Sequence, residues 1–109
     1  MKLLIVGSRS IKNFDISPYV PKNVDTIISG GANGIDRLAE QHADLHRLSK
    51  YIVRPRYDLY GRSAPLKRNE EMVHMADAVL MIWDGVSRGT QYTLHFSQKM
   101  NKPITLIRV

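Results

Sequence analysis

The sequence predicts an α/β fold, a three-layer sandwich around a five-stranded parallel sheet with the strand order 3-2-1-4-5. Three observations lead to this prediction. Short apolar runs alternate along the chain with segments whose apolar residues recur at helical spacing. The run Ala78–Trp83 is the most apolar, and it suits a strand at the centre of a sheet that is covered on both faces. Right-handed crossovers restrict the topology further, and the first and fourth strands are then neighbours where the strand order reverses.

The expected strands are short apolar runs, and residues that interrupt a sheet follow two of them. Gly7 comes after the first run, and Pro55 stops the third. The N-terminal run is better explained by a strand than by a signal peptide, because it is too short for an apolar signal core and lacks a cleavage site. The five expected strands are Leu3–Val6, Val24–Ser29, Tyr51–Arg54, Ala78–Trp83 and Ile104–Val109.

Helices are expected between these strands. Apolar residues recur at helical spacing from Ile35 to about Leu48. Pro65 suits the first turn of another helix, and Ser63 suits its N-cap. The buried side of that helix is expected to carry Leu66, Met72, Val73 and Ala76. The other expected segments are a short helix over Phe14–Tyr19, a polar loop over Arg56–Ala64, and a helix over Gly89–Met100 with Asn101 at its C′ position.

Composition bounds the class of protein. A length of 109 residues suits a single domain, residues 1–109. The chain has no cysteine, which excludes disulfides and thiol nucleophiles and fits a reducing cytoplasm. No apolar stretch approaches the roughly 20 residues that span a bilayer, so no membrane partner is expected. The four histidines show no convergent metal spacing, so no metal is predicted. The formal charge of +6 fits nucleic acid, a polyanionic ligand or a charged surface.

The most informative motif is Ser29-Gly30-Gly31-Ala32-Asn33-Gly34-Ile35-Asp36. It leads from an expected strand into an expected helix. Glycine lets the backbone approach a ligand closely, and the first N–H groups of a helix point at an anion. The glycine spacing differs from the dinucleotide-binding fingerprint and from the Walker loop, and the Lys-Ser/Thr pair of the latter is missing. The motif therefore predicts a phosphate site, and the residues around it must indicate which ligand it binds.

Four strand exits should open on the same edge of the sheet, where ligands of such folds bind. They carry glycines, hydroxyl groups and arginines, which together form an oxyanion site. The exits are Gly7-Ser8-Arg9-Ser10, Ser29–Gly34, Arg54-Pro55-Arg56 and Trp83-Asp84-Gly85-Val86-Ser87-Arg88-Gly89-Thr90. Seven basic residues are expected to gather there: Arg9, Arg54, Arg56, Arg62, Lys67, Arg68 and Arg88. The alternative for Ser87-Arg88-Gly89-Thr90 is that it is only a helix cap, in which Ser87 or Thr90 accepts the first amides.

Two carboxylates are expected near the loops. Asp84 lies at the carboxyl end of the fourth strand and is a candidate for holding a ribose hydroxyl or a catalytic water. Asp36 and Glu40 lie one turn apart near a helix start, where their default role is to favour the helix dipole. His42 and His46 have a spacing that could chelate a metal, but such pairs are usually surface or packing residues.

At these residues the chain resembles the small SLOG domains, and more narrowly their subgroup related to YspA and YpsA. The resemblance spans nearly the whole chain and implies a Rossmann-like parallel sheet that binds a nucleotide or a nucleotide-derived signal. Dimer-forming relatives make a homodimer an expectation as well. The matching segments are Gly7-Ser8-Arg9, Ser29–Asp36, Lys67-Arg68-Asn69, Ala76-Asp77 and Trp83–Thr90.

Two branches of that superfamily imply different functions. The Lonely Guy phosphoribohydrolases cleave the base from a nucleoside monophosphate with a Pro-Gly-Gly-x-Gly-Thr-x-x-Glu loop and an arginine. Here Gly89-Thr90 is retained, Thr93 stands at the position of the glutamate, and Arg68 corresponds to the arginine. DNA-processing protein A, which binds single-stranded DNA, has a loop similar to Ser29–Asp36 and an Arg-Asn pair similar to Arg68-Asn69.

Three functions therefore stay open. The first is binding of a nucleotide-like small molecule. The second is a nucleotide hydrolase, for which Arg68, Asp84 and Asp36 are the catalytic candidates. The third is single-stranded nucleic-acid binding, with Tyr57, Tyr60 and Trp83 as candidates for stacking on bases. The ligand-binding candidates are Gly7, Ser8, Arg9, Ser29, Gly30, Gly31, Ala32, Asn33, Gly34, Asp36, Arg68, Asn69, Asp84, Gly85, Ser87, Arg88, Gly89 and Thr90.

Overall fold

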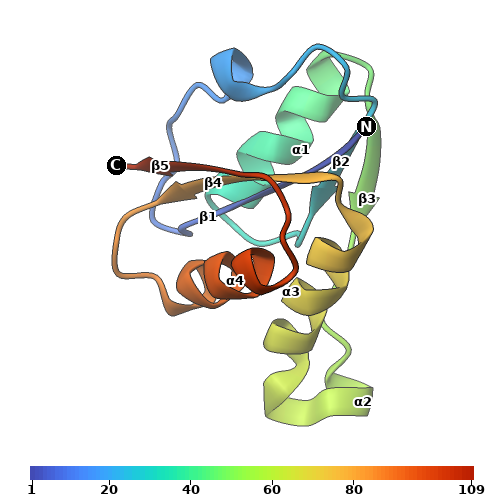
Figure 1. Cartoon of the computed structure of the whole chain (residues 1–109), viewed down its shortest axis with the longest axis vertical. Helices are drawn as coiled ribbons and strands as arrows, with labels where there is room; N and C mark the ends of the chain where they lie inside the picture. The colour runs from blue at the N-terminus through green and yellow to red at the C-terminus, as the bar shows by residue number, and fades with distance from the viewer.

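A computed structural model describes all 109 residues and contains one five-stranded, all-parallel sheet in the order β3-β2-β1-β4-β5 (Figure 1). This confirms the predicted Rossmann-like α/β fold and its strand order. The first and fourth strands pair side by side, with Gly7 opposite Ile82 at their carboxyl ends. The strands are β1 (Lys2–Gly7), β2 (Thr26–Ser29), β3 (Ser49–Ile52), β4 (Ala78–Trp83) and β5 (Ile104–Arg108).

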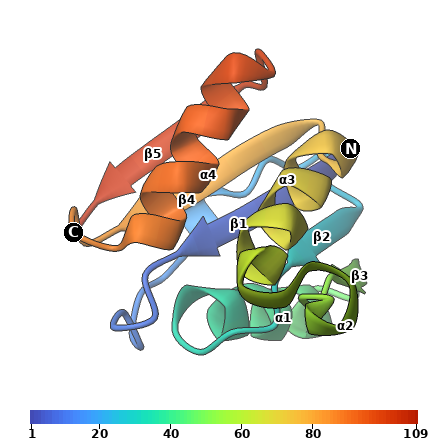
Figure 2. The ribbon, with the colours of Figure 1, turned by 90° about the horizontal axis from the view of Figure 1, so that it is seen from below.

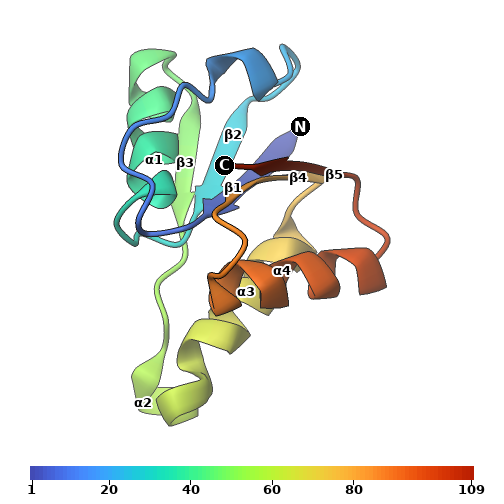
Figure 3. The ribbon, with the colours of Figure 1, turned by 90° about the vertical axis from the view of Figure 1, so that its left-hand side faces the viewer.

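Helices cover both faces of the sheet. Helix α1 (Ile35–Leu45) packs on one face, and helices α3 (Ala64–Met75) and α4 (Arg88–Lys99) pack on the other (Figures 2 and 3). Three shorter segments complete the fold: a 3₁₀ turn η1 (Ser17–Tyr19), helix α2 (Tyr57–Tyr60) and a 3₁₀ turn η2 (Gly61–Ser63). No helix is long and apolar enough to cross a lipid bilayer.

Alternation along the central strands divides the core into two layers, because successive side chains of a strand point to opposite faces. Leu3 and Ile5 of β1 join the apolar cluster beneath α1. Leu4 and Val6 join the cluster that Met72 of α3 fills from the other face. The sheet is thus held between two dry layers, and its carboxyl edge is fixed relative to the helices that begin there.

The structure corrects the predicted helix over Phe14–Tyr19 and the predicted end of the first long helix. Pro18 has no N–H to bond the carbonyl of Phe14, and only the short turn η1 forms. Helix α1 ends at Leu45 because Arg47 adopts a left-handed conformation (φ 57°), and the N–H of Leu48 bonds the carbonyl of Ala43. At the end of α4 the same arrangement places Asn101 (φ 57°) at C′, as predicted.

The segment predicted as a polar loop, Arg56–Ala64, contains α2 and η2. Both project away from the sheet, below it in Figure 1. Strand β3 also begins earlier and ends earlier than the predicted Tyr51–Arg54. Ser63 does not cap α3, since its hydroxyl donates to the carbonyl of Tyr60 instead.

Candidate functional site

A cavity of about 370 Å³ lies at the switch point, between the carboxyl ends of the central strands and the first turns of α3 and α4. Its volume is in the range of small-molecule sites. Polar groups and apolar groups both contribute to its walls. The lining residues are Val6, Gly7, Arg9, Ser10, Ala32, Asp36, Pro65, Leu66, Arg68, Asn69, Met72, Asp84, Ser87, Gly89, Thr90 and Thr93.

The most tightly held cation of the cavity is the guanidinium of Arg68 on α3, which is only 8% exposed. Its Nη1 donates to the carbonyl of Gly30 at 2.6 Å, and its Nε donates to the Oδ1 of Asn69 at 2.9 Å. A longer contact of 3.4 Å joins Nη1 to the carbonyl of Val53. Burial lowers the pKa of Arg68, but an arginine keeps its charge over the physiological range. The side chain is therefore a fixed positive charge at the edge of the sheet.

The glycine loop supplies the partner for this arginine. A Cβ on Gly30 would lie 2.7 Å from Nη1 of Arg68 and 2.9 Å from Oδ2 of Asp36, so any larger residue would displace these side chains. Two of the loop amides have partners within the chain. The N–H of Gly31 donates to the hydroxyl of Ser29, and the N–H of Ala32 donates to Asp36. The loop therefore orients side chains of the cavity.

Asp36 is the buried carboxyl group of the cavity, at 7% exposed. Its Oδ2 accepts the N–H of Ala32 at 3.1 Å. Burial raises the pKa of Asp36 to about 6, although the Ala32 hydrogen bond and the charges of Arg68 and Arg9 act in the opposite direction. This carboxyl group therefore exchanges its proton close to neutral pH.

Asp84 is the other carboxyl group of the cavity, and its surroundings stabilise the charged form. Its Oδ1 accepts the N–H groups of Val86 and Ser87, each at 2.9 Å, and its Oδ2 accepts the hydroxyl of Ser10 at 3.1 Å. The backbone hydrogen bonds, more than the hydroxyl, lower the pKa of Asp84 to about 2. Two carboxyl groups with opposite pKa shifts thus line one cavity.

The N-terminus of α4 opens on the same cavity through Ser87, Gly89 and Thr90. The alternative role of this segment as a helix cap is not seen, because neither Ser87 nor any other side chain accepts an N–H of the first turn. The hydroxyls of Ser87 and Thr90 instead lie 3.3 Å apart. The first-turn amides of α4 have no partners inside the helix, and the positive end of its dipole faces the cavity.

Ten of the predicted ligand-binding residues line the cavity, and eight do not. The lining residues are Gly7, Arg9, Ala32, Asp36, Arg68, Asn69, Asp84, Ser87, Gly89 and Thr90. Two of the others make side-chain hydrogen bonds within the chain. The hydroxyl of Ser8 accepts the N–H of Asp84, and that of Ser29 donates to Glu40. The residues outside the lining are Ser8, Ser29, Gly30, Gly31, Asn33, Gly34, Gly85 and Arg88.

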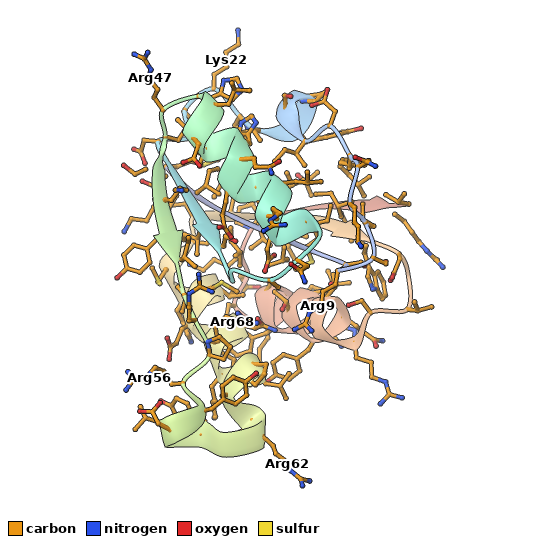
Figure 4. The ribbon with its side chains drawn as sticks, turned by 180° about the vertical axis from the view of Figure 1, so that it is seen from behind. Arg9, Lys22, Arg47, Arg56, Arg62 and Arg68 are labelled. Atoms are coloured by element: carbon orange, nitrogen blue, oxygen red, sulfur yellow. The ribbon has the colours of Figure 1, made fainter.

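Of the seven basic residues that were predicted at this edge, Arg9 and Arg68 line the cavity. Figure 4 shows these two below the carboxyl edge of the sheet, and it shows Arg56 and Arg62 on the projecting segment around α2. Arg56 pairs with Asp58 at 3.1 Å, two residues away in the chain. Arg54, Lys67 and Arg88 are exposed and lie outside the lining.

Six lining residues were not among the predicted binding residues: Val6, Ser10, Pro65, Leu66, Met72 and Thr93. Helical spacing could have found some of them. Pro65 and Met72 lie on the face of α3 that carries Arg68, and Thr93 lies one turn beyond Gly89 on α4. Leu66, predicted to be buried, is 38% exposed and faces the cavity.

The histidine pair forms no larger metal-ligating group. The rings of His42 and His46 lie 4.2 Å apart, and no cluster of three or more histidine or carboxylate side chains is present.

Comparisons of the chain with protein-family models, with curated proteins and with solved structures give no significant match. The geometry of the cavity and the motifs of the sequence therefore carry the functional argument.

Proposed function

We propose that the chain binds a nucleotide or a nucleotide-derived phosphorylated ligand in the cavity at the switch point. The observation that carries this proposal is the guanidinium of Arg68, buried and held by Gly30 and Asn69, in the same cavity as the uncapped start of α4. A fixed cation and free helix amides in one cavity are the donors that a phosphate group requires. The SLOG resemblance favours the same class of ligand.

The phosphate end of the ligand fits best at α4. Its first-turn amides and the hydroxyls of Ser87 and Thr90 are donors on that side, and the guanidinium groups of Arg9 and Arg68 line the same cavity. Asp84 is charged there, but it is already engaged by two backbone N–H groups and the hydroxyl of Ser10. Its remaining lone pairs suit a ribose hydroxyl, which is a donor.

The base end fits the wall that α3 contributes. Pro65, Leu66 and Met72 are apolar, and Asn69 of the same helix lines the cavity with them. An aromatic base packs against apolar side chains and is oriented by a few polar groups, which is the usual composition of a small-molecule site. Asp36 is placed to donate or accept according to its protonation.

The proposal is tested by ligand-induced stabilisation. A panel of nucleoside mono-, di- and triphosphates is added to dialysed protein, and Tm is followed by scanning fluorimetry. A ligand at one hundred times its Kd adds about 2.7 kcal/mol to the free energy of unfolding, which raises Tm by roughly 10 °C in a domain of this size. The variant Arg68→Met should lose this shift, and Arg56→Met, which removes an arginine outside the cavity, should keep it.

Two results would contradict the proposal. One is a panel in which no nucleotide raises Tm. The other is an Arg68→Met protein that still folds and binds with the affinity of the wild type, since the buried guanidinium would then have no part in recognition.

A nucleotide hydrolase is the second candidate, and the two carboxyl groups favour it. An acid with a raised pKa and a base that stays ionised are the pair that glycosidic or phosphate-ester hydrolysis uses. Asp36 would donate the proton, and Asp84 would activate water or stabilise developing positive charge. Release of base or phosphate from a nucleoside monophosphate should then fall at least about a hundredfold in both Asp36→Asn and Asp84→Asn. Turnover that survives both substitutions would remove this candidate.

A further inference from the structure

A second cavity, of about 480 Å³, lies beside the first half of α1. Its walls come from the segment after β1, from the end of the glycine loop and from α1 itself. Figure 3 shows the segment after β1 running alongside α1. The lining residues are Lys12, Asn13, Asn33, Gly34, Arg37, Leu38 and Gln41.

The second cavity is basic, and its polar side chains are exposed to solvent. Lys12 and Arg37 contribute two positive charges, and no carboxylate lines the cavity. The ion pairs of the chain involve neither of them. Asn13, Asn33 and Gln41 add three side-chain amides, and none of the five polar side chains makes a hydrogen bond within the chain. A cavity with this composition attracts an anion and can hydrogen-bond the groups attached to it.

The two cavities are lined by neighbouring residues of the same two segments. Arg9 and Ser10 line the first cavity, and the same segment continues into Lys12 and Asn13 of the second. In the glycine loop, Ala32 lines the first and Asn33 lines the second. Between them Gly34 rests on the backbone of Ser8 and Arg9, where a Cβ would lie 2.6 Å from the carbonyl of either residue.

We propose that the second cavity binds a second phosphate group of a phosphodiester-linked ligand, whose first nucleotide occupies the cavity at the switch point. The ligand class is a linear dinucleotide or a short single-stranded oligonucleotide. This inference rests on the proposed function. It assigns a ligand group to the second cavity, which a mononucleotide bound in the first cavity would leave empty. Lys12 and Arg37 neutralise the second phosphate, and the three side-chain amides bond its sugar or base edges.

The test compares a fluorescein-labelled single-stranded hexanucleotide of random sequence with a mixture of the four nucleoside 5′-monophosphates. Binding is followed by fluorescence anisotropy for the first and by competition for the second. The wild type should bind the hexanucleotide at least about tenfold more tightly, because two further cations are engaged. The double variant Lys12→Gln, Arg37→Gln should lose this advantage and keep its affinity for the monophosphates.

Salt dependence gives an independent readout. Each phosphate contact of a single strand contributes about 0.7 to the slope of log affinity against log salt concentration, so the double variant should lose about 1.4. The matched control is Lys22→Gln, Arg62→Gln, which removes the same two charges at exposed sites outside both cavities (Figure 4). Its affinity and its salt slope should equal those of the wild type.

The outcomes separate the two proposals. Equal affinity of the wild type for monophosphates and hexanucleotide overturns the second cavity as a phosphate site and leaves the first intact. An equal loss in the variant and its control also overturns it, because the effect would then come from net charge alone. If neither ligand binds the wild type, the proposed function fails and the inference fails with it.

Discussion

Helices α1 and α4 both begin at the carboxyl edge of the sheet, and the packing around their first residues differs. At the start of α1, Gly34 is packed on the backbone of Ser8, whose carbonyl accepts the N–H of Ile35 at 3.5 Å. The preceding loop is closed further by the bond from Ala32 to Asp36. No side chain caps either helix, but at the start of α4 Gly89 has open space where a Cβ would be.

The difference shows that a glycine-rich strand exit has two separate uses. Around Gly30 and Gly34 the glycines permit close approach, and the chain uses that approach to position Arg68, Asp36 and the segment after β1. At α4 the open backbone itself faces the cavity. The start of α1 is therefore packed tightly against the segment after β1, and the start of α4 is open toward the cavity.

The largest expected effect on the free energy of unfolding comes from changing glycine to alanine at one of these two helix starts and not at the other. Gly34→Ala requires an alanine at φ 76°, ψ −128° with its Cβ 2.6 Å from two carbonyl oxygens. We expect it to lower the free energy of unfolding by about 3 kcal/mol or more in urea denaturation. Gly89→Ala is the matched control, and it should raise that free energy by about 0.5 to 1 kcal/mol because it lies within a helix with no neighbour near its Cβ.

A similar loss in both variants would contradict the comparison, since the start of α4 would then be as tightly packed as that of α1. A mild effect of Gly34→Ala would mean that the contact with Ser8 and Arg9 yields easily.

The next effect distinguishes the two carboxyl groups by pH. The folded chain binds the proton of Asp36 more tightly than the unfolded chain, with a pKa of about 6 against 3.8. Its contribution to stability is therefore complete below pH 4 and is lost as the pH rises to about 6, a total of about 3 kcal/mol. Asp36→Asn should remove this loss, so that the variant gains stability over the wild type between pH 4 and pH 8 in urea titrations.

Asp84 should behave in the opposite direction. Its pKa is lowered to about 2, so its contribution is present at neutral pH and is lost as the pH falls from about 4 toward 2. Asp84→Asn should therefore lower the free energy of unfolding at pH 7, with the difference shrinking in acid. Curves of the same sign for the two variants would show that the two carboxyl groups share one environment.

The sequence was sufficient for the fold because the fold depends on local and periodic signals. Apolar runs locate the strands, and alternation with helical segments implies a parallel sheet. The side chain of Asn101 tolerates a left-handed backbone, which identifies the end of α4. Helix α2 carries no such signal, since it has four residues and no side chain caps it. Its formation depends on the path of the chain between β3 and α3.

The position of the cavity could be predicted from the sequence, but only some of its lining residues could. The switch-point rule locates the cavity, and ten of the predicted residues line it. The bond between Arg68 and Gly30 joins residues 38 positions apart, so the link between the glycine loop and α3 could not be predicted from the sequence. Arg56 was predicted to gather with the others because its local pairing with Asp58 cannot be deduced from strand order.

The smallest expected effect tests the open helix start directly. Serine at an N-cap normally contributes about 0.5 to 2 kcal/mol, because its hydroxyl accepts a first-turn N–H. Ser87 has the position of a cap without that hydrogen bond, so Ser87→Ala should change the free energy of unfolding by less than about 0.5 kcal/mol. The same variant should bind nucleotide more weakly, since one hydroxyl donor of the cavity is lost. A loss of stability of 1 kcal/mol or more would mean that Ser87 caps α4 in solution. Both helix starts would then be closed, and the anion would have to be bound by Arg9 and Arg68 without helix amides.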